Sequence, residues 1–306
     1  MRIDRLVREI RRCGNPAALG LDTRAEFVPE GFSRPLLKAG AQTADVVFAF
    51  NAALLDGLRD IIPCVKIQAA YYELLGPGGM LCLRKTLDEA QRLGYVTITD
   101  AKRGDIGATA SAYASAYVGP SAQFPSDFVT VNPYLGTDGI KPFIKDCGDT
   151  GRGIFVLVKT SNPSSGEFQD LTVSDGRTLY EHVADKVSLW GDGMIGEEGY
   201  SSVGAVVGAT YPVQGAALRR RMPHTFFLLP GYGAQGASAA GLAGCFDDNG
   251  GGAVVNASRS ILCAYKKNAS GESDFVGAAR EEALRMRDDL RHALGYMGGV
   301  FYGRHG

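Results

Sequence analysis

The chain has 306 residues, a formal net charge of −1 and 45% hydrophobic residues, so it is long enough to bury a large core. The near-neutral charge gives no support for a nucleic-acid or membrane-surface partner, and no apolar stretch is long enough to span a bilayer. The N-terminal segment carries charges throughout and lacks the apolar centre of a signal peptide. Its residues Ile3, Leu6, Val7 and Ile10 predict an amphipathic helix. We therefore expect a cytosolic protein.

Eight short apolar segments follow along the chain and are typical of buried strands. They are residues 17–22, 63–68, 95–100, 128–132, 153–161, 203–210, 225–230 and 252–256. Helical patterns lie between them at 43–58, 83–93, 178–190 and 275–296, and the link 133–152 has the weakest pattern. This alternation predicts a parallel sheet covered by helices. Eight strands in a chain of this length favour one (β/α)8 TIM barrel domain over residues 1–306, rather than an open doubly wound sheet.

Polar residues gather at the carboxyl ends of these predicted strands. They are Asp22, Lys66, Asp100, Lys102, Asn132, Ser161, Thr210 and Arg259. In a barrel these ends converge on one face, where active sites lie. A single D-x-K-x-x-D cluster is more often a solvated loop, but the shared position of all these residues favours a functional site. Residues 162–176, rich in Ser, Gly and Asp, predict a loop over this face.

The glycine-rich segment 231–236 matches G-x-G-x-x-G. In a dinucleotide-binding fold this motif follows the first strand, and an acidic residue ends the next one. Here it follows the seventh strand, and Asn256 and Arg259 stand where the acidic residue is needed. A barrel phosphate site has this arrangement, since glycine amides and arginine bind phosphate oxygens. We expect a phosphate monoester as ligand; the alternative is a plain turn with an arginine salt bridge.

Six motifs together resemble the orotidine 5′-monophosphate decarboxylase family, in its longer bacterial branch. They are A-L-G-L-D at 18–22, D-A-K-R-G-D-I at 100–106, V-N-P-Y-L-G at 131–136, K-T-S-N-P at 159–163, P-G-Y-G-A-Q-G at 230–236 and V-N-A-S-R-S-I at 255–261. One departure is Lys-Ile-Gln at 66–68, where the family has Pro after Lys. The resemblance implies conversion of orotidine 5′-monophosphate to uridine 5′-monophosphate and CO2, the last step of UMP biosynthesis. It implies no cofactor and no metal, and the histidines and cysteines show no ligand spacing.

The resemblance also implies roles for the charged residues. Lys102 would stabilise the carbanion that forms at pyrimidine C6 and then protonate it. Asp100 would lie near the substrate carboxylate, and Lys66 would bridge Asp100 and the ribose hydroxyls. Two aspartates, Asp100 and Asp105, would keep Lys102 protonated.

The remaining implied contacts hold the substrate. Asp22 would bind ribose, and Ser161 the pyrimidine edge. Gln235 and Arg259 would bind the phosphate, helped by Gly233 and by backbone amides near Ser258. Pro230 is a further implied substrate-binding residue.

In the family, the second aspartate of the motif reaches the neighbouring subunit's site. The resemblance therefore implies a homodimer in which Asp105, Ile106 and Thr109 serve the partner's ligand. Residues 107–114 would then pack a subunit interface; the alternative is a helix packed tightly on its own barrel.

Two other functions are open at this point. A metal-dependent sugar-phosphate decarboxylase or aldolase needs acidic Mg²⁺ ligands at the strand ends. Asp22 and Asp100 could supply them, but Asn132 and Thr210 are poor additions. A non-catalytic nucleotide-binding protein would have no need of the lysine–aspartate array.

Overall fold

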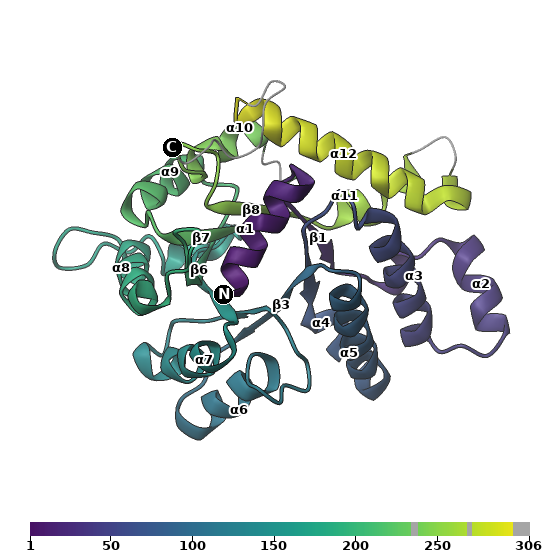
Figure 1. The fold of residues 1–306 in the computed structure, drawn as a ribbon, viewed down its shortest axis with the longest axis horizontal. Helices are drawn as coiled ribbons and strands as arrows, with labels where there is room; N and C mark the ends of the chain where they lie inside the picture. The colour runs from purple at the N-terminus through teal and green to yellow at the C-terminus, as the bar shows by residue number, and fades with distance from the viewer. Residues whose placement is uncertain (234–237, 268–270, 296–306) are drawn as a thin grey trace.

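The computed structural model describes residues 1–233, 238–267 and 271–295. Eight parallel strands form one closed barrel in sequence order, and the last strand pairs with the first (Figure 1). The strands are β1 Ala17–Leu21, β2 Cys64–Gln68, β3 Val96–Arg103, β4 Phe128–Val131, β5 Gly153–Lys159, β6 Ser201–Val207, β7 Thr225–Pro230 and β8 Ala253–Ala257. The predicted (β/α)8 TIM barrel is confirmed.

Helices surround this barrel, and the first of them lies across one end of it (Figure 1). They are α1 Arg2–Cys13, α2 Glu30–Lys38, α3 Thr43–Leu58, α4 Ala69–Glu73, α5 Gly76–Arg92, α6 Gly107–Tyr117, α7 Thr137–Thr150, α8 Leu179–Gly191, α9 Pro212–Arg221, α10 Ala239–Leu242, α11 Arg259–Leu262 and α12 Phe275–Ala293. None of the described helices is long and apolar enough to cross a membrane.

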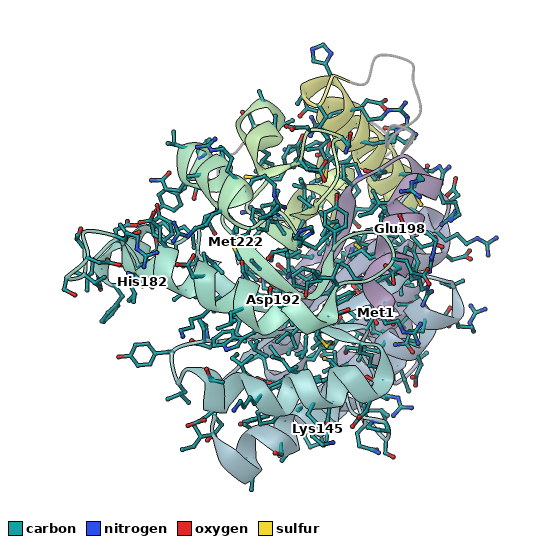
Figure 2. The ribbon with its side chains drawn as sticks, turned by 60° about the vertical axis from the view of Figure 1, so that its left-hand side comes forward. Met1, Lys145, His182, Asp192, Glu198 and Met222 are labelled. Atoms are coloured by element: carbon teal, nitrogen blue, oxygen red, sulfur yellow. The ribbon has the colours of Figure 1, made fainter. Side chains whose placement is uncertain are left out.

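One predicted strand boundary needs correction, and the structure adds detail to two other expectations. Strand β3 runs on to Arg103 rather than ending at Asp100, because its pairing with β4 resumes after an irregularity. The segment with the weakest helical pattern contains the full helix α7, whose Ile140, Phe143 and Cys147 are buried although Pro142 lies inside it. The predicted mouth loop holds the short 3₁₀ helix Pro163–Glu167 and projects beside α8, whose His182 is labelled in Figure 2.

Side chains inside the barrel form an apolar plug. Helix α1 packs against this plug and covers the end of the barrel that lies opposite the carboxyl ends of the strands. Inward residues such as Cys64, Phe128 and Phe155 pack with Ile3 and Ile10 in one buried cluster. The predicted amphipathic face of the N-terminal helix is therefore buried under the barrel. Since this end is closed, a ligand can enter the barrel only from the carboxyl ends of the strands.

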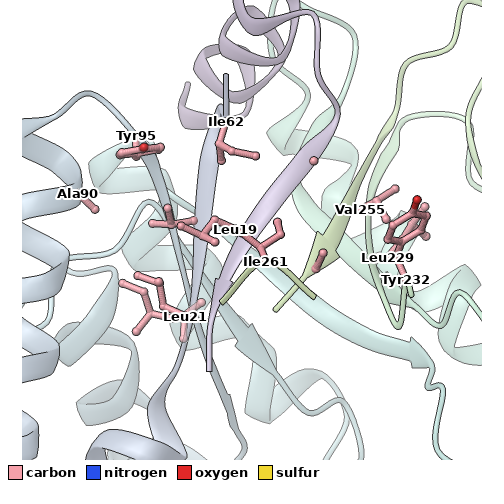
Figure 3. Close-up of a cluster of buried hydrophobic side chains, with 14 of the residues drawn as sticks. Leu19, Leu21, Ile62, Ala90, Tyr95, Leu229, Tyr232, Val255 and Ile261 are labelled. Carbon is pink, nitrogen blue, oxygen red and sulfur yellow. The ribbon is translucent and has the colours of Figure 1, made fainter. Parts of the chain in front are cut away.

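The outward side chains of the strands pack against the helices in a second, larger cluster, part of which Figure 3 shows. Along β1, Leu19 and Leu21 belong to this outer cluster, whereas Ala18 belongs to the plug. This alternation is the two-residue period of a strand. The same alternation continues toward the carboxyl ends of the strands, so every second residue after the plug faces the barrel axis.

Candidate active site

A cavity of about 570 Å³ opens at the carboxyl ends of the strands. Its apolar part consists of Leu157, Val206 and Leu228, which continue the plug. Its polar lining comes from the strands and from the segment after β5. These residues are Asp22, Lys66, Gln68, Asp100, Lys102, Thr130, Thr160, Ser161, Asn162, Gln169, Asn256, Ser258 and Arg259.

Asp100 is the centre of the charged cluster. Its Oδ1 accepts hydrogen bonds from Lys102 Nζ at 2.6 Å and from Thr130 Oγ1 at 2.9 Å. Its Oδ2 accepts from Lys66 Nζ and Gln68 Nε2, both at 3.1 Å. Four donors from three strands therefore fix both carboxylate oxygens, and the carboxylate has little freedom to rotate.

A second carboxylate completes the cluster. Lys66 Nζ lies 3.1 Å from Asp22 Oδ1, so this ammonium joins Asp22 at the end of β1 to Asp100 on β3. The Lys66 side chain is only 3% exposed, whereas that of Lys102 is 46% exposed at the cavity. Lys66 is thus held by protein groups, and Lys102 has a free side toward a ligand.

The local charges keep this cluster ionised. Burial alone would raise the pKa of Asp100, but the ammonium groups of Lys66 and Lys102 and their hydrogen bonds hold that pKa well below its usual value. Burial likewise opposes the charged form of Lys66, but Asp22 and Asp100 raise its pKa above the usual value. A buried carboxylate and a buried ammonium therefore persist at neutral pH.

Lys102 has an unusual backbone. Among the residues that the structure describes, it is the only non-glycine with a positive φ, at 47°. The left-handed conformation costs a residue with a Cβ atom about 1–3 kcal/mol, and such residues cluster at functional sites. This conformation is part of what turns the Lys102 side chain toward Asp100.

On the opposite wall, β8 brings Asn256 and Ser258 to the cavity. Asn256 Nδ2 donates to Ser258 Oγ at 3.2 Å. Both side chains lie against Gly20 of β1, where an added Cβ would stand 1.9 Å from Ser258 Oγ and 2.9 Å from Asn256 Oδ1. Glycine at position 20 is therefore what allows these two polar side chains to occupy the barrel end.

The predicted phosphate residues that the structure describes, and Pro230 with them, lie at the far side of the cavity. Pro230, Ser258 and Arg259 line it, and Arg259 also borders a neighbouring hollow that Gly233 lines. Gly231 and Gly233 have φ values of 110° and 74°, which require glycine. Gln235 lies outside the described residues.

Three predicted site residues that follow β3 line neither this cavity nor the neighbouring hollow. Asp105 is half-buried, and its Oδ1 accepts the Ile106 amide at 2.8 Å. Ile106 is 55% exposed, and Thr109 is exposed on α6. Of the other strand-end residues, Asn132 is exposed and Thr210 donates to the Ser161 carbonyl at 3.4 Å, and neither lines the cavity.

Sequence reasoning gave no site role to six polar residues of the cavity, which are Gln68, Thr130, Thr160, Asn162, Gln169 and Asn256. Gln68 and Thr130 both bind Asp100, and Gln169 docks on Thr160 through hydrogen bonds of 2.9 and 2.8 Å. The two-residue alternation along β2 and β4 predicts that Gln68 and Thr130 face the barrel axis, because Cys64 and Phe128 on the same strands do so. Gln169 comes from the mouth loop, and no pattern in that segment marks it.

Within the described residues, no three His, Cys, Asp or Glu side chains lie together in an arrangement that could hold a metal ion. Asp22 and Asp100 are joined by the Lys66 ammonium instead. A closed α/β barrel whose mouth combines this lysine–aspartate cluster with an arginine and left-handed glycines defines a class: barrel enzymes that act on small anionic molecules.

Comparison with known proteins narrows this class. Residues 44–273 match the model of the orotidine 5′-phosphate decarboxylase / HUMPS family. Orotidine 5′-phosphate decarboxylase of Rhodopirellula baltica is 43% identical over an alignment of 291 residues, and the match covers 92% of this chain and 96% of that protein. The enzyme of the same name from Clostridium novyi is 41% identical and covers 94% of this chain and 98% of its own. The chain belongs to this family.

A solved structure agrees with this assignment. The OMP decarboxylase of Leishmania donovani superposes with a TM-score of 0.69 at 30% identity, covering 94% of this chain and 98% of that one. The resemblance deduced from the six sequence motifs is therefore confirmed.

Proposed function

We propose that this protein decarboxylates orotidine 5′-monophosphate to uridine 5′-monophosphate and CO2, without a metal or a cofactor, as the last step of UMP biosynthesis. The observation that carries the proposal is the continuous contact from Asp22 through Lys66 and Asp100 to Lys102 at the cavity. This cluster lies in a chain that matches decarboxylases over nearly their whole length.

The reaction breaks the bond between pyrimidine C6 and the carboxylate carbon. CO2 leaves and the electron pair stays on C6, where no Schiff base or similar electron sink receives it. The Lys102 ammonium, which has a free side toward the cavity, stabilises this charge and gives a proton to C6. The neutral amine then regains a proton from solvent.

The rigid surroundings of Lys102 support this role. Asp100 is fixed by four donors, so it holds the Lys102 ammonium in place at 2.6 Å. A fixed charge stabilises a transition state at no cost of reorganisation. The Asp100 carboxylate would also face the substrate carboxylate, and their repulsion would be relieved as CO2 leaves.

The other residues bind parts of the substrate remote from C6. Asp22 and Lys66 would bind the ribose hydroxyls, and Ser161 the pyrimidine edge. The phosphate would lie at the far wall, bound by Gln235 and Arg259 with help from Gly233 and from backbone amides near Ser258. Binding energy from this remote group can raise the rate as well as the affinity.

We further propose a homodimer with shared sites. Asp105, Ile106 and Thr109 do not line the cavity of their own chain, which supports a role in a partner's cavity. Ile106 is exposed, and so are the apolar Tyr134 and Leu135 on the next loop, at 79% and 48%. Exposed apolar groups of this kind are typical of subunit contacts. We also propose a cytosolic location, and the charge of the substrate and product, which do not cross a bilayer unaided, supports it.

Turnover can be measured directly from the absorbance change as orotidine 5′-monophosphate becomes the product. We expect purified protein to give this change at the same rate with and without EDTA. A rate that EDTA removes and Mg²⁺ restores would favour the metal-dependent alternative. Tight nucleotide binding with no turnover would favour the non-catalytic one.

Replacement of Arg259 by alanine should lower kcat/KM for the nucleotide by at least about 10-fold, because a charge-assisted hydrogen bond contributes about 1.5–3 kcal/mol. The phosphate-free nucleoside should be turned over almost equally by the variant and the parent protein. Arg34→Ala is the matched control, since Arg34 is 66% exposed on α2. Equal losses for both substrates would show that Arg259 does not bind phosphate.

A further inference from the structure

The pairing of β3 with β4 is interrupted at the charged cluster. Thr99 pairs with Val129 and Arg103 pairs with Val131, so residues 100–102 of β3 all lie opposite the single residue Thr130. A bulge of this kind leaves backbone groups without their usual ladder partners and redirects side chains. Both Asp100 and Lys102 belong to this bulge.

The Thr130 hydroxyl takes the place of the missing ladder partner. The Lys102 amide donates to Thr130 Oγ1 at 2.9 Å, and the hydroxyl in turn donates to Asp100 Oδ1 at 2.9 Å. That same Oδ1 accepts Lys102 Nζ at 2.6 Å. One buried hydroxyl, in a residue that is 1% exposed, thus joins the backbone of Lys102 to the carboxylate that holds its side chain.

From this geometry we infer that Thr130 is a positioning residue, which fixes the left-handed backbone of Lys102 and so aims its ammonium at the reacting carbon. The inference rests on the proposed function for its effect on turnover. Its physical basis is independent of the reaction. A left-handed lysine persists only where its surroundings enforce it, and the Thr130 hydroxyl binds the amide of that residue directly.

The test compares Thr130→Val, which removes the hydroxyl but keeps the branched shape, with Thr130→Ser, which keeps the hydroxyl. The valine variant should lose roughly 10- to 100-fold in kcat, the size of effect that a displacement of about 1 Å produces. Its KM should change far less, since the groups that bind ribose and phosphate are untouched. The serine variant should recover most of the lost kcat.

Thr97 offers a matched control in the same barrel. Its Oγ1 donates to Asp127 Oδ2 at 3.2 Å and accepts the Asp127 amide at 3.0 Å, so it makes the same kind of buried bridge away from the cavity. Thr97→Val should therefore lose stability like Thr130→Val but keep its kcat. A Thr130→Val protein with normal kcat, or a folded Thr130→Ser protein as slow as the valine variant, would overturn the inference.

Hydrogen exchange gives a readout that does not depend on turnover. The Lys102 amide should be protected in the parent protein and in Thr130→Ser, and exposed to exchange in Thr130→Val. If the valine variant does not fold, Thr130→Ala removes the same hydroxyl and replaces it in this comparison. Absence of turnover in the parent protein would reject the proposed function, whereas an unprotected Lys102 amide in the parent would reject the role of Thr130.

Discussion

Lys102→Ala should abolish decarboxylation while leaving UMP binding measurable. Proton transfer by a positioned group contributes about 10²–10⁴-fold to a rate, and one electrostatic contact contributes about 10²–10³-fold. Lys102 combines both roles, so we expect kcat to fall by at least about 10⁴-fold. Binding should survive, because Arg259 and Ser258 lie on the opposite wall of the cavity and Asp100 keeps its contacts with Lys66 and Gln68.

Lys145→Ala provides the control for loss of a lysine as such. Lys145 lies on the outer surface of α7 (Figure 2), its side chain is 75% exposed, and it pairs with Asp149 of the same helix. This variant should turn over substrate like the parent protein. Near-normal turnover in Lys102→Ala, measured from the same absorbance change, would remove Lys102 from the mechanism and with it the proposed proton donor.

The strands could be predicted because both of their faces are buried. Inward residues join the plug and outward residues contact helices, so each strand is a short continuous apolar run. The bounds of β7 match the prediction at both ends. Helix α7 was harder to see, since Gly139, Pro142 and Gly148 dilute its pattern. Its helical form depends on burial of Ile140 and Phe143, a tertiary effect.

Part of the candidate site also follows from the strand period. Cys64 belongs to the plug, so Lys66 and Gln68 face the barrel axis two and four residues later. Phe128 places Thr130 in the same way. Counting in twos from the plug would therefore have found Gln68 and Thr130, which the motif comparison passed over.

The bulge in β3 has no comparable signal. Residues 95–100 read as an ordinary strand with a charged end, and the extra residues become visible only when β3 is paired with β4. The left-handed backbone of Lys102 is likewise a property of that pairing and of the Thr130 hydroxyl. A single sequence does not specify the register of two neighbouring strands, that is, which residue of β4 lies opposite a given residue of β3.

The position of Asp105 predicts a second large loss of activity, in the Asp105→Ala variant. It follows Lys102 by three residues, yet it does not line the cavity that Lys102 lines. If it serves the partner's cavity, each site takes Lys102 from one chain and Asp105 from the other. Lys102→Ala and Asp105→Ala homodimers should then both be severely impaired, because every site in either protein lacks one of the two residues.

Mixing the two variants should restore activity once subunits exchange. In a heterodimer one site carries both defects, and the other combines the intact Lys102 of the Asp105→Ala chain with the intact Asp105 of the Lys102→Ala chain. With random exchange of equal amounts, half of the dimers are mixed and half of their sites are intact. About one quarter of the sites should therefore work, which is a simple consequence of two-fold symmetry.

A second mixture tests whether recovery depends on this sharing. Lys66 and Lys102 bind the same Asp100 within one chain, so a heterodimer of Lys66→Ala with Lys102→Ala contains no intact site. That mixture should stay inactive under the conditions that revive the first one. If mass measurement confirms exchange in both mixtures and neither regains activity, Asp105 does not act across the subunit boundary. The exposed loop that carries it would then need another explanation, with Ile106 and Thr109 reassigned along with it.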